Sequence, residues 1–191
     1  MSALDDAPHV AADDRATWRA WLAANHATAR GAWLVGGLGR PGTDLSYEAA
    51  VEEALCFGWI DGTGRRHEDG GRVQYFAPRG PRSGWAASNK ARIERLLAEG
   101  RMAPAGLAAI ERAKANGSWT VLDGPERLEV PDDLAAALDA RPPAAANFGA
   151  FTASARKMLL AWIATARRPE TRAARIGRVV EAAAENRRAV E

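Results

Sequence analysis

Hydrophobic and polar positions in the first sixty residues predict a helix, a strand and a second helix, in that order. The buried face of the first helix recurs at spacings of three and four: Trp18, Trp21, Leu22 and Asn25. Asp13 or Asp14 can cap this helix, which we expect to run to about Ala29. Residues 32–35 are apolar on both faces, which indicates a strand covered on both sides.

The second predicted helix begins after Ser46, a residue type that commonly caps helices. Its apolar stripe is formed by Tyr47, Val51, Ala54, Leu55 and Gly58. Glu48, Glu52 and Glu53 lie off this stripe, and we expect them on the solvent-facing side of the helix. Cys56 lies in an apolar last turn, so we interpret it as a buried structural cysteine.

Two short strands, residues 59–66 and 72–77, follow the second helix. The letters HEDGG join them, and Asp69-Gly70 is a strong signal for a two-residue hairpin turn. The predicted sheet therefore has about three strands and is antiparallel, with helices packed on both sides.

From Ser83 onward the pattern is helical. The predicted helices are 83–100, 104–116, 131–140, 144–167 and 170–189. The fold class is therefore α+β and mostly helical, with the sheet and its hairpin in the N-terminal half and an all-helical C-terminal half. We expect three segments: a flexible N-terminus (1–12), an α+β core (13–125) and a helical part packed on that core (126–191).

Composition is that of an ordinary globular protein, with 47% hydrophobic and 26% charged residues in 191. The single cysteine excludes an intramolecular disulfide. No apolar run approaches the ~20 residues of a membrane helix, and the acidic first residues do not resemble a signal peptide. We therefore expect a cytoplasmic protein without membrane insertion.

Several longer segments carry a family resemblance. They are WRAWLAANH (18–26), YEAAVEEALCFGWIDG (47–62), YFAPR (75–79), SGWAASNKARIERLLAEGRMAPAGLAAIERAKANGSW (83–119) and SARKMLLAWIATARRPETRAARI (154–176). In this order they resemble the YdeI/OmpD-associated family, also described as bacteriocin-protection proteins. The resemblance implies tolerance of antimicrobial or envelope stress. It brings no settled enzymatic activity, so no catalytic residue and no cofactor are carried over, and we lean towards a protein that is not an enzyme.

The residues most suggestive of a ligand site lie at the open end of the hairpin. With the two-residue turn, Asp61 falls opposite Pro78, and Arg79 lies one step beyond. A guanidinium beside a carboxylate can also receive the carboxylate or phosphate of a ligand. The proposed ligand-binding residues are Trp59, Asp61, Arg79, Trp85, Asn89 and Arg92. The alternative is a structural salt bridge between hairpin and helix, with both tryptophans in the core.

Three functions remain open at this point. The first is a non-enzymatic tolerance protein that binds a small polar or acidic ligand, or a peptide. The second is an uncharacterised enzyme that uses the Asp61/Arg79 cleft, and the third is a nucleic-acid-binding module. The third depends on Arg168, Arg172 and Arg175, which share one face of the last helix, but a solvated face is the better interpretation. A protein partner is a further alternative, and no metal-ligand spacing is present.

Overall fold

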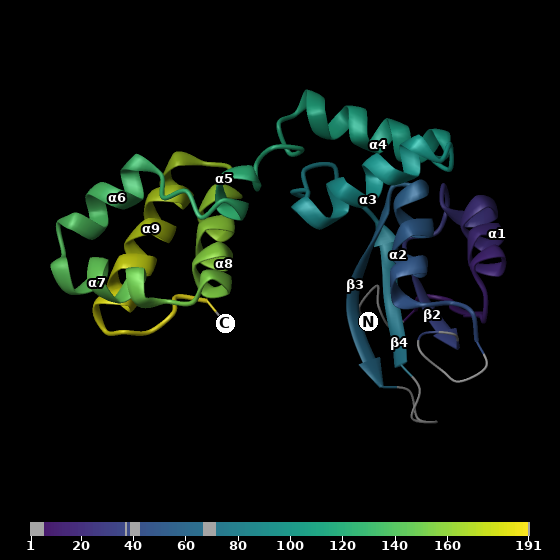
Figure 1. The fold of residues 1–191 in the computed structure, drawn as a ribbon, viewed down its shortest axis with the longest axis horizontal. Helices are drawn as coiled ribbons and strands as arrows, with labels where there is room; N and C mark the ends of the chain where they lie inside the picture. Colours follow the sequence, from purple (N-terminus) through teal and green to yellow (C-terminus); the bar gives the residue numbers. More distant parts are fainter. Residues whose placement is uncertain (1–5, 37, 39–42, 67–71, 191) are drawn as a thin grey trace. The chain divides into compact units, whose positions relative to one another are not determined.

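The computed structural model describes residues 6–36, 38, 43–66 and 72–190 (Figure 1). These described residues form two compact units. The first unit comprises Met1–Ser83 and Ser88–Asn116, and the second comprises Gly84–Ala87 and Gly117–Glu191. The main crossover between units therefore lies at 116/117, nine residues before the expected boundary at 125/126.

The first unit combines a sheet with helices on the pattern predicted from the sequence. Its elements are β1 (His9–Ala12), α1 (Arg15–Asn25), β2 (Ala32–Gly36), α2 (Tyr47–Cys56), β3 (Trp59–Arg66), β4 (Arg72–Pro78), α3 (Ala87–Ala98) and α4 (Pro104–Ala115). Asp14 and Ser46 cap α1 and α2 through their side-chain oxygens, as expected.

Within the described residues the sheet has four strands in the order β1-β2-β4-β3 (Figure 1). The prediction of about three antiparallel strands was incomplete, because β1 pairs with β2 in parallel. β1 lies in the segment expected to be a flexible N-terminus, and its four residues are too few to give a periodic signal. Pairing with β2 is what makes this segment a strand.

The register of β3 against β4 also differs from the predicted one. Asp61 lies opposite Phe76, so its predicted pairing with Pro78 is wrong. The register shifts between Asp61 and Gly64, where β3 holds one residue more than β4. A bulge of this kind cannot be read from strand spacing, because it depends on the partner strand.

The pairing nearest the turn places Arg66 opposite Arg72. A two-residue turn centred on Asp69-Gly70 would have placed Arg66 opposite Val73. The predicted Asp69-Gly70 turn lies outside the described residues, so the correction concerns only the register of the two strands that flank it.

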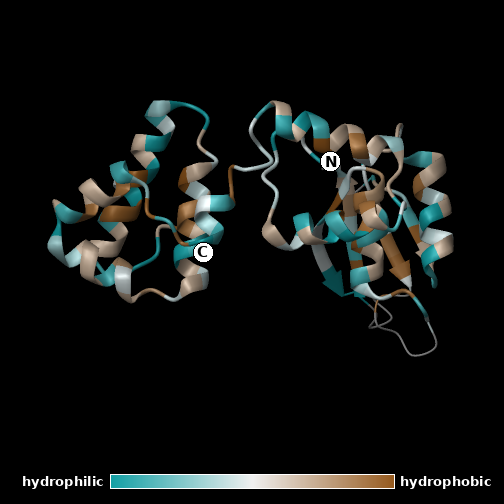
Figure 2. Cartoon of the chain, turned by 45° about the horizontal axis from the view of Figure 1, so that its top comes forward, coloured by the Kyte–Doolittle hydropathy of each residue, from teal (hydrophilic) through white to brown (hydrophobic). Residues whose placement is uncertain are grey.

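The two faces of the sheet differ in the side chains that pack on them. On the face of Leu34 and Phe76, Trp18 of α1 packs against the Phe76 ring at 5.3 Å and donates its indole N–H to Ala50 O of α2 at 3.1 Å. Trp18 thus joins this face of the sheet to α2. The other face carries a smaller apolar cluster, Trp33, Val73 and Tyr75. The central strands are hydrophobic, whereas the end of β3 is hydrophilic (Figure 2).

The second unit is helical in the part of the chain that is described. Its elements are α5 (Asp123–Glu126), α6 (Asp132–Asp139), α7 (Pro142–Ala150), α8 (Ala153–Ala164) and α9 (Pro169–Ala184). The predicted helix 144–167 is thus two helices, because Phe151 ends α7 in an extended conformation and Thr152 caps α8 by accepting the N–H of Ala155 at 3.2 Å. Their core is formed by Leu134, Leu138, Ala144, Phe148, Leu159, Leu160, Ile163, Ile176, Val179, Val180 and Ala183.

No helix among the described residues combines the length and the apolar character needed to cross a membrane.

Candidate functional site

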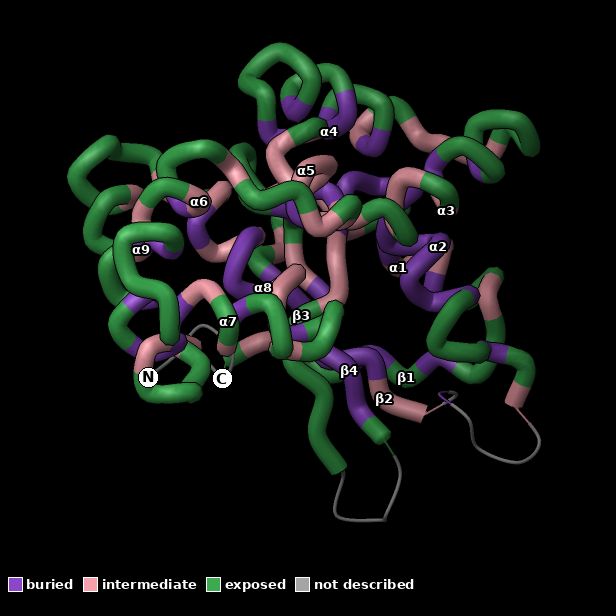
Figure 3. The backbone as a smooth tube through the Cα atoms, turned by 60° about the vertical axis from the view of Figure 1, so that its left-hand side comes forward, coloured by how far each residue is buried: buried purple, intermediate pink, exposed green. Residues whose placement is uncertain are grey.

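Two of the three glutamates of α2 are buried, contrary to the prediction that all three face solvent; Glu48 is exposed, as predicted. Glu52 is 5% exposed and Glu53 is fully buried, and the whole helix is drawn largely as buried in Figure 3. Ionised carboxylates are buried only when cations and hydrogen bonds compensate for the lost water. The question is therefore which groups cover them.

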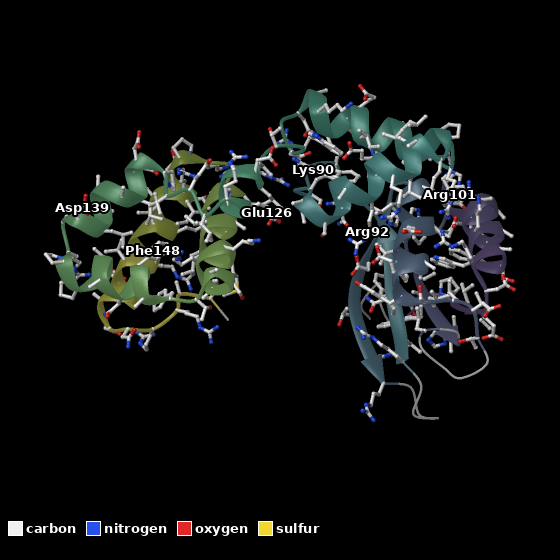
Figure 4. All side chains as sticks on the ribbon, in the orientation of Figure 1. Lys90, Arg92, Arg101, Glu126, Asp139 and Phe148 are labelled. Atoms are coloured by element: carbon white, nitrogen blue, oxygen red, sulfur yellow. The ribbon has the colours of Figure 1, made fainter. Side chains whose placement is uncertain are left out.

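Arginines from three parts of the chain surround these two carboxylates. Arg15 and Arg19 of α1 each donate to Glu53, at 3.3 Å and 2.7 Å, and Arg15 also donates to Glu52 at 2.7 Å. Arg101, which follows α3, donates to Glu53 as well (Figure 4). We call this set the Glu53 cluster: Arg15, Arg19, Glu52, Glu53, Arg95 and Arg101.

The electrostatics of the Glu53 cluster favour an ionised Glu52. Burial acts to raise the pKa of Glu52, but hydrogen bonds from Arg15 and Arg95 hold that pKa below its usual value. Cys56 adjoins the cluster, and burial raises the pKa of its thiol although Arg19 opposes this. The thiol is therefore protonated and fully buried, which agrees with a structural cysteine.

A second polar group is centred on Asp61. The hydroxyl of Tyr47, the first residue of α2, donates to Asp61 Oδ2 at 2.5 Å. Burial, together with this hydrogen bond to Asp61, raises the pKa of Tyr47 to about 12. Tyr47 is nevertheless 38% exposed, so its ring reaches the surface while its hydroxyl is fixed.

Arg79 and Asp61 interact electrostatically, as the sequence suggested, although through a different register. Burial lowers the pKa of Arg79 to about 10, and the Asp61 carboxylate opposes that shift. The guanidinium remains charged at neutral pH. The side chain is 8% exposed, so Arg79 stands behind Asp61 as a buried cation.

Arg92, labelled in Figure 4, and Asn89 of α3 complete this group. Arg92 Nη1 donates to Asn89 Oδ1 at 2.9 Å, and two further nitrogens donate to the Glu48 carboxylate at 2.8 Å and 2.7 Å. Arg92 is also within electrostatic range of Tyr47 and Asp61. We call this set the Asp61 cluster: Tyr47, Glu48, Asp61, Arg79, Asn89 and Arg92.

The two tryptophans of the predicted site are not walls of the Asp61 cluster. Trp59 is 1% exposed, donates its indole N–H to His26 O at 3.2 Å and packs edge-on against Trp21. Trp85 is also 1% exposed and belongs to the second unit, where its ring lies 5.1 Å from that of Trp119. Both are core residues, in accordance with the structural alternative.

Four of the six members of the Asp61 cluster were predicted from the sequence as site residues, but Tyr47 and Glu48 were not, and the Glu53 cluster was not predicted, although a signal existed. Glu48 and Glu52 are four residues apart on α2, Arg15 and Arg19 are four apart on α1, and Arg92 and Arg95 recur in α3. Matching spacings of opposite charge on consecutive helices suggest that charged faces meet. Tyr47 was placed on the apolar stripe, and its hydroxyl was overlooked.

The basic last helix is partly used within the second unit. Arg172 donates two hydrogen bonds to Asp133, at 2.6 Å and 2.8 Å, and Arg175 donates to Trp162 O and to Thr165 Oγ1. Only Arg168 of the three keeps a wholly exposed position. Among the described residues, no group of three potential metal ligands is present.

Two family models match different parts of the chain. Residues 10–109, more than half of the chain, match the family described as a domain of unknown function (DUF8412). The chain belongs to that family. Residues 127–186 match a second family, described as bacteriocin-protection, YdeI or OmpD-associated, which confirms the resemblance seen in the sequence. No curated protein and no solved structure matches.

The two matches divide as the two units do. The DUF8412 match covers residues of the first unit apart from Gly84–Ala87, and it contains both clusters, together with the segments ALCFGWIDG and SGWAASNKAR. The match to the bacteriocin-protection family lies in the second unit. The second match implies a bacteriocin-protection-type function, whereas the DUF8412 family brings no activity.

Proposed function

We propose that the chain confers bacteriocin-protection-type tolerance by binding a small acidic ligand, or the acidic group of a peptide, at the Asp61 cluster of its DUF8412 domain. A cytoplasmic location and a non-enzymatic role are parts of the same proposal. The observation that carries it is the position of Asp61, which is held at 2.5 Å by a half-exposed tyrosine and backed by a buried arginine.

The arginines of the cluster, and not its net charge, which Glu48 and Asp61 balance, favour an acidic ligand. Asp61 is already engaged by Tyr47 and Arg79, and Glu48 is engaged by Arg92. Arginine presents a fork of donors that matches carboxylate and phosphate oxygens. A rigid group of this kind loses little conformational entropy on binding, because its side chains are already fixed by one another.

Purified full-length chain should first be screened by thermal shift against glutamate, succinate, inorganic phosphate and short peptides. A ligand at ~100 times its dissociation constant adds about 2.7 kcal/mol of stability. Each kcal/mol moves the midpoint of a domain of this size by roughly 4 °C, so binding is readily seen.

The functional test uses cells that produce the chain and are challenged with bacteriocin. We expect survival to rise with the wild-type chain and to fall back with Asp61→Asn or Arg92→Gln. Arg112→Gln is the matched control, because Arg112 is an exposed arginine of α4 outside both clusters. Circular dichroism must show all three variants folded. Full protection by folded Asp61→Asn and Arg92→Gln would refute a role for the cluster.

A further inference from the structure

The hairpin end of the sheet places two arginines directly opposite each other. Arg66 of β3 and Arg72 of β4 are cross-strand partners, and both are exposed. Partners in an antiparallel pair point to the same face of a sheet, and like charges in these positions destabilise the pair. An anion bound between the two guanidinium groups would offset this repulsion.

One member of the arginine pair, Arg72, contacts the Asp61 cluster. The guanidinium carbon of Arg72 lies 5.6 Å from the centre of the Tyr47 ring, and its charge acts on the Tyr47 hydroxyl. Gly64 lies beneath it, and a Cβ added at Gly64 would come within 3.5 Å of Arg72 Nη2 and 2.8 Å of Gln74 Oε1. The missing side chain at Gly64 therefore leaves the approach to Arg72 open.

A ligand can reach Arg66 and Arg72 from the edge of the sheet. β3 is an edge strand, and its residues from Gly62 to Arg66 are exposed (Figure 3). The bulge between Asp61 and Gly64 and the positive charge of the strand end disfavour the addition of another strand. A small anion is the better occupant.

Local charge indicates which anion. Among the described residues, Arg66 and Arg72 add two positive charges to the Asp61 cluster, in which Arg79 and Arg92 balance Glu48 and Asp61. Glu68 and Asp69 lie outside the described residues and are not part of this sum. A phosphate monoester is close to a dianion at neutral pH and offers three acceptor oxygens. A carboxylate carries one charge and can fully occupy only one guanidinium fork.

We propose that Arg66 and Arg72 bind a phosphoryl dianion beside Tyr47, so that the acidic ligand of the Asp61 cluster is a phosphate ester. This inference rests on the proposed function and adds two residues and a ligand class to it. Binding removes the repulsion between the two arginines, and the Tyr47 ring supplies an apolar contact for the organic part of the ester.

Isothermal titration of the full-length chain with phenyl phosphate, inorganic phosphate and benzoate tests this directly. We expect phenyl phosphate to bind at least about tenfold more tightly than benzoate. Arg66→Gln and Arg72→Gln should each weaken phenyl phosphate binding about tenfold, the loss expected for one charge-assisted pair. Arg112→Gln is again the control and should bind as the wild type does.

Stability gives an independent readout. In phosphate-free buffer, Arg66→Gln should raise the thermal midpoint, because it removes the repulsion, and added phosphate should stabilise the wild type more than the variant. Equal affinity for benzoate and phenyl phosphate, or undiminished binding by both glutamine variants, would overturn the phosphoryl assignment. Glu68 and Asp69 lie between the two arginines in sequence and outside the described residues. Phenyl phosphate binding by the double variant Glu68→Gln/Asp69→Asn, but not by the wild type, would also overturn the assignment.

Failure of this inference differs from failure of the proposed function. A wild-type chain that protects cells but does not bind phenyl phosphate loses only the phosphoryl assignment. A chain that binds phenyl phosphate through Arg66 and Arg72 but gives no protection loses only the proposed function.

Discussion

At the scale of single residues, the side chain of Tyr47 is partly exposed to solvent while its hydroxyl is held by a hydrogen bond. Its backbone begins α2, its ring lies partly in solvent, and its hydroxyl donates to Asp61. The hydrogen bond to Asp61 stabilises the neutral phenol. Ionisation of Tyr47 would place two negative charges 2.5 Å apart, which is why the phenol resists it.

Tyr47 should therefore make stability depend on alkaline pH. Its pKa is raised from 10.0 to about 12 in the folded chain, so its stabilising effect is present below pH 10 and is lost as the pH rises toward 12. We expect the wild type to lose more unfolding free energy than Tyr47→Phe between pH 9 and pH 12. Denaturant unfolding at several pH values measures this.

The matching spectroscopic test follows the phenolate absorbance. The chain has two tyrosines, so the difference between wild type and Tyr47→Phe isolates the phenol of Tyr47. A midpoint of that difference near pH 10 would contradict the fixed hydrogen bond to Asp61.

At the scale of elements, α2 is the helix on which the first unit is organised. One side of it faces the sheet and α1, and the side that carries its glutamates meets arginines from α1, α3 and the segment after α3. Such ion networks add less to net stability than their contacts suggest, because desolvation opposes them. Breaking one partner is costly, however, since the remaining charges lose their counter-ion.

Glu53→Gln should accordingly destabilise the first unit by about 3 kcal/mol, because three arginines lose a fully buried carboxylate. Glu99→Gln is the control, since Glu99 contacts Arg101 but its side chain is 42% exposed, and it should stay within about 0.5 kcal/mol of the wild type. Chemical denaturation compares the two. Equal effects would show that burial does not set the contribution of these pairs.

The packing of α4 on the end of α2 gives a second prediction at this scale. A Cβ at Gly106 would lie 2.2 Å from Cys56 O, which accepts the N–H of Ala103 at 3.0 Å. We expect Gly106→Ala to destabilise the first unit by about 2 kcal/mol through overpacking.

Gly177→Ala is the matched comparison, because Gly177 lies within α9 with open space around its Cβ position. There alanine should stabilise the second unit by about 0.5–1 kcal/mol. Thermal unfolding of both variants against the wild type decides the matter, and a neutral Gly106→Ala would show that α4 can move away from α2.

At the scale of the whole molecule, the chain is divided in an order that sequence position does not suggest. Gly84–Ala87 belongs to the second unit although Ser83 and Ser88 on either side belong to the first. Trp85 is the reason, since its buried ring packs on Trp119, some thirty residues later. Trp85 thus belongs to the core of the second unit although it precedes residues 88–116 of the first unit in the sequence.

Trp85→Ala should destabilise the second unit by about 3–5 kcal/mol and leave the first largely unchanged. Hydrogen exchange read by mass spectrometry separates the two, because α8 and α9 should lose protection while α2 and β4 keep theirs. Trp59→Ala, which removes a core residue of the first unit, should give the reverse pattern. Loss of protection confined to the first unit in Trp85→Ala would contradict the assignment.

Sequence alone determined the secondary structure in considerable detail. The caps at Asp14 and Ser46, the limits of β3 and the start of α4 at Pro104 follow from local chemistry, because caps, prolines and strand periodicity act over a few residues. The family resemblance and the pairing of Asp61 with Arg79 were likewise visible in the residues themselves.

Tertiary structure decided what depends on distant partners. The parallel pairing of β1, the bulge at Asp61 and the burial of Glu53 each require a second segment to arrive, and no local pattern encodes it. A glutamate off an apolar stripe is exposed in a lone helix, but it is buried once arginines from other helices compensate for the water it loses. Trp85, a predicted ligand-site residue, lies instead in the core of the second unit, because its ring packs on Trp119, which is distant in sequence.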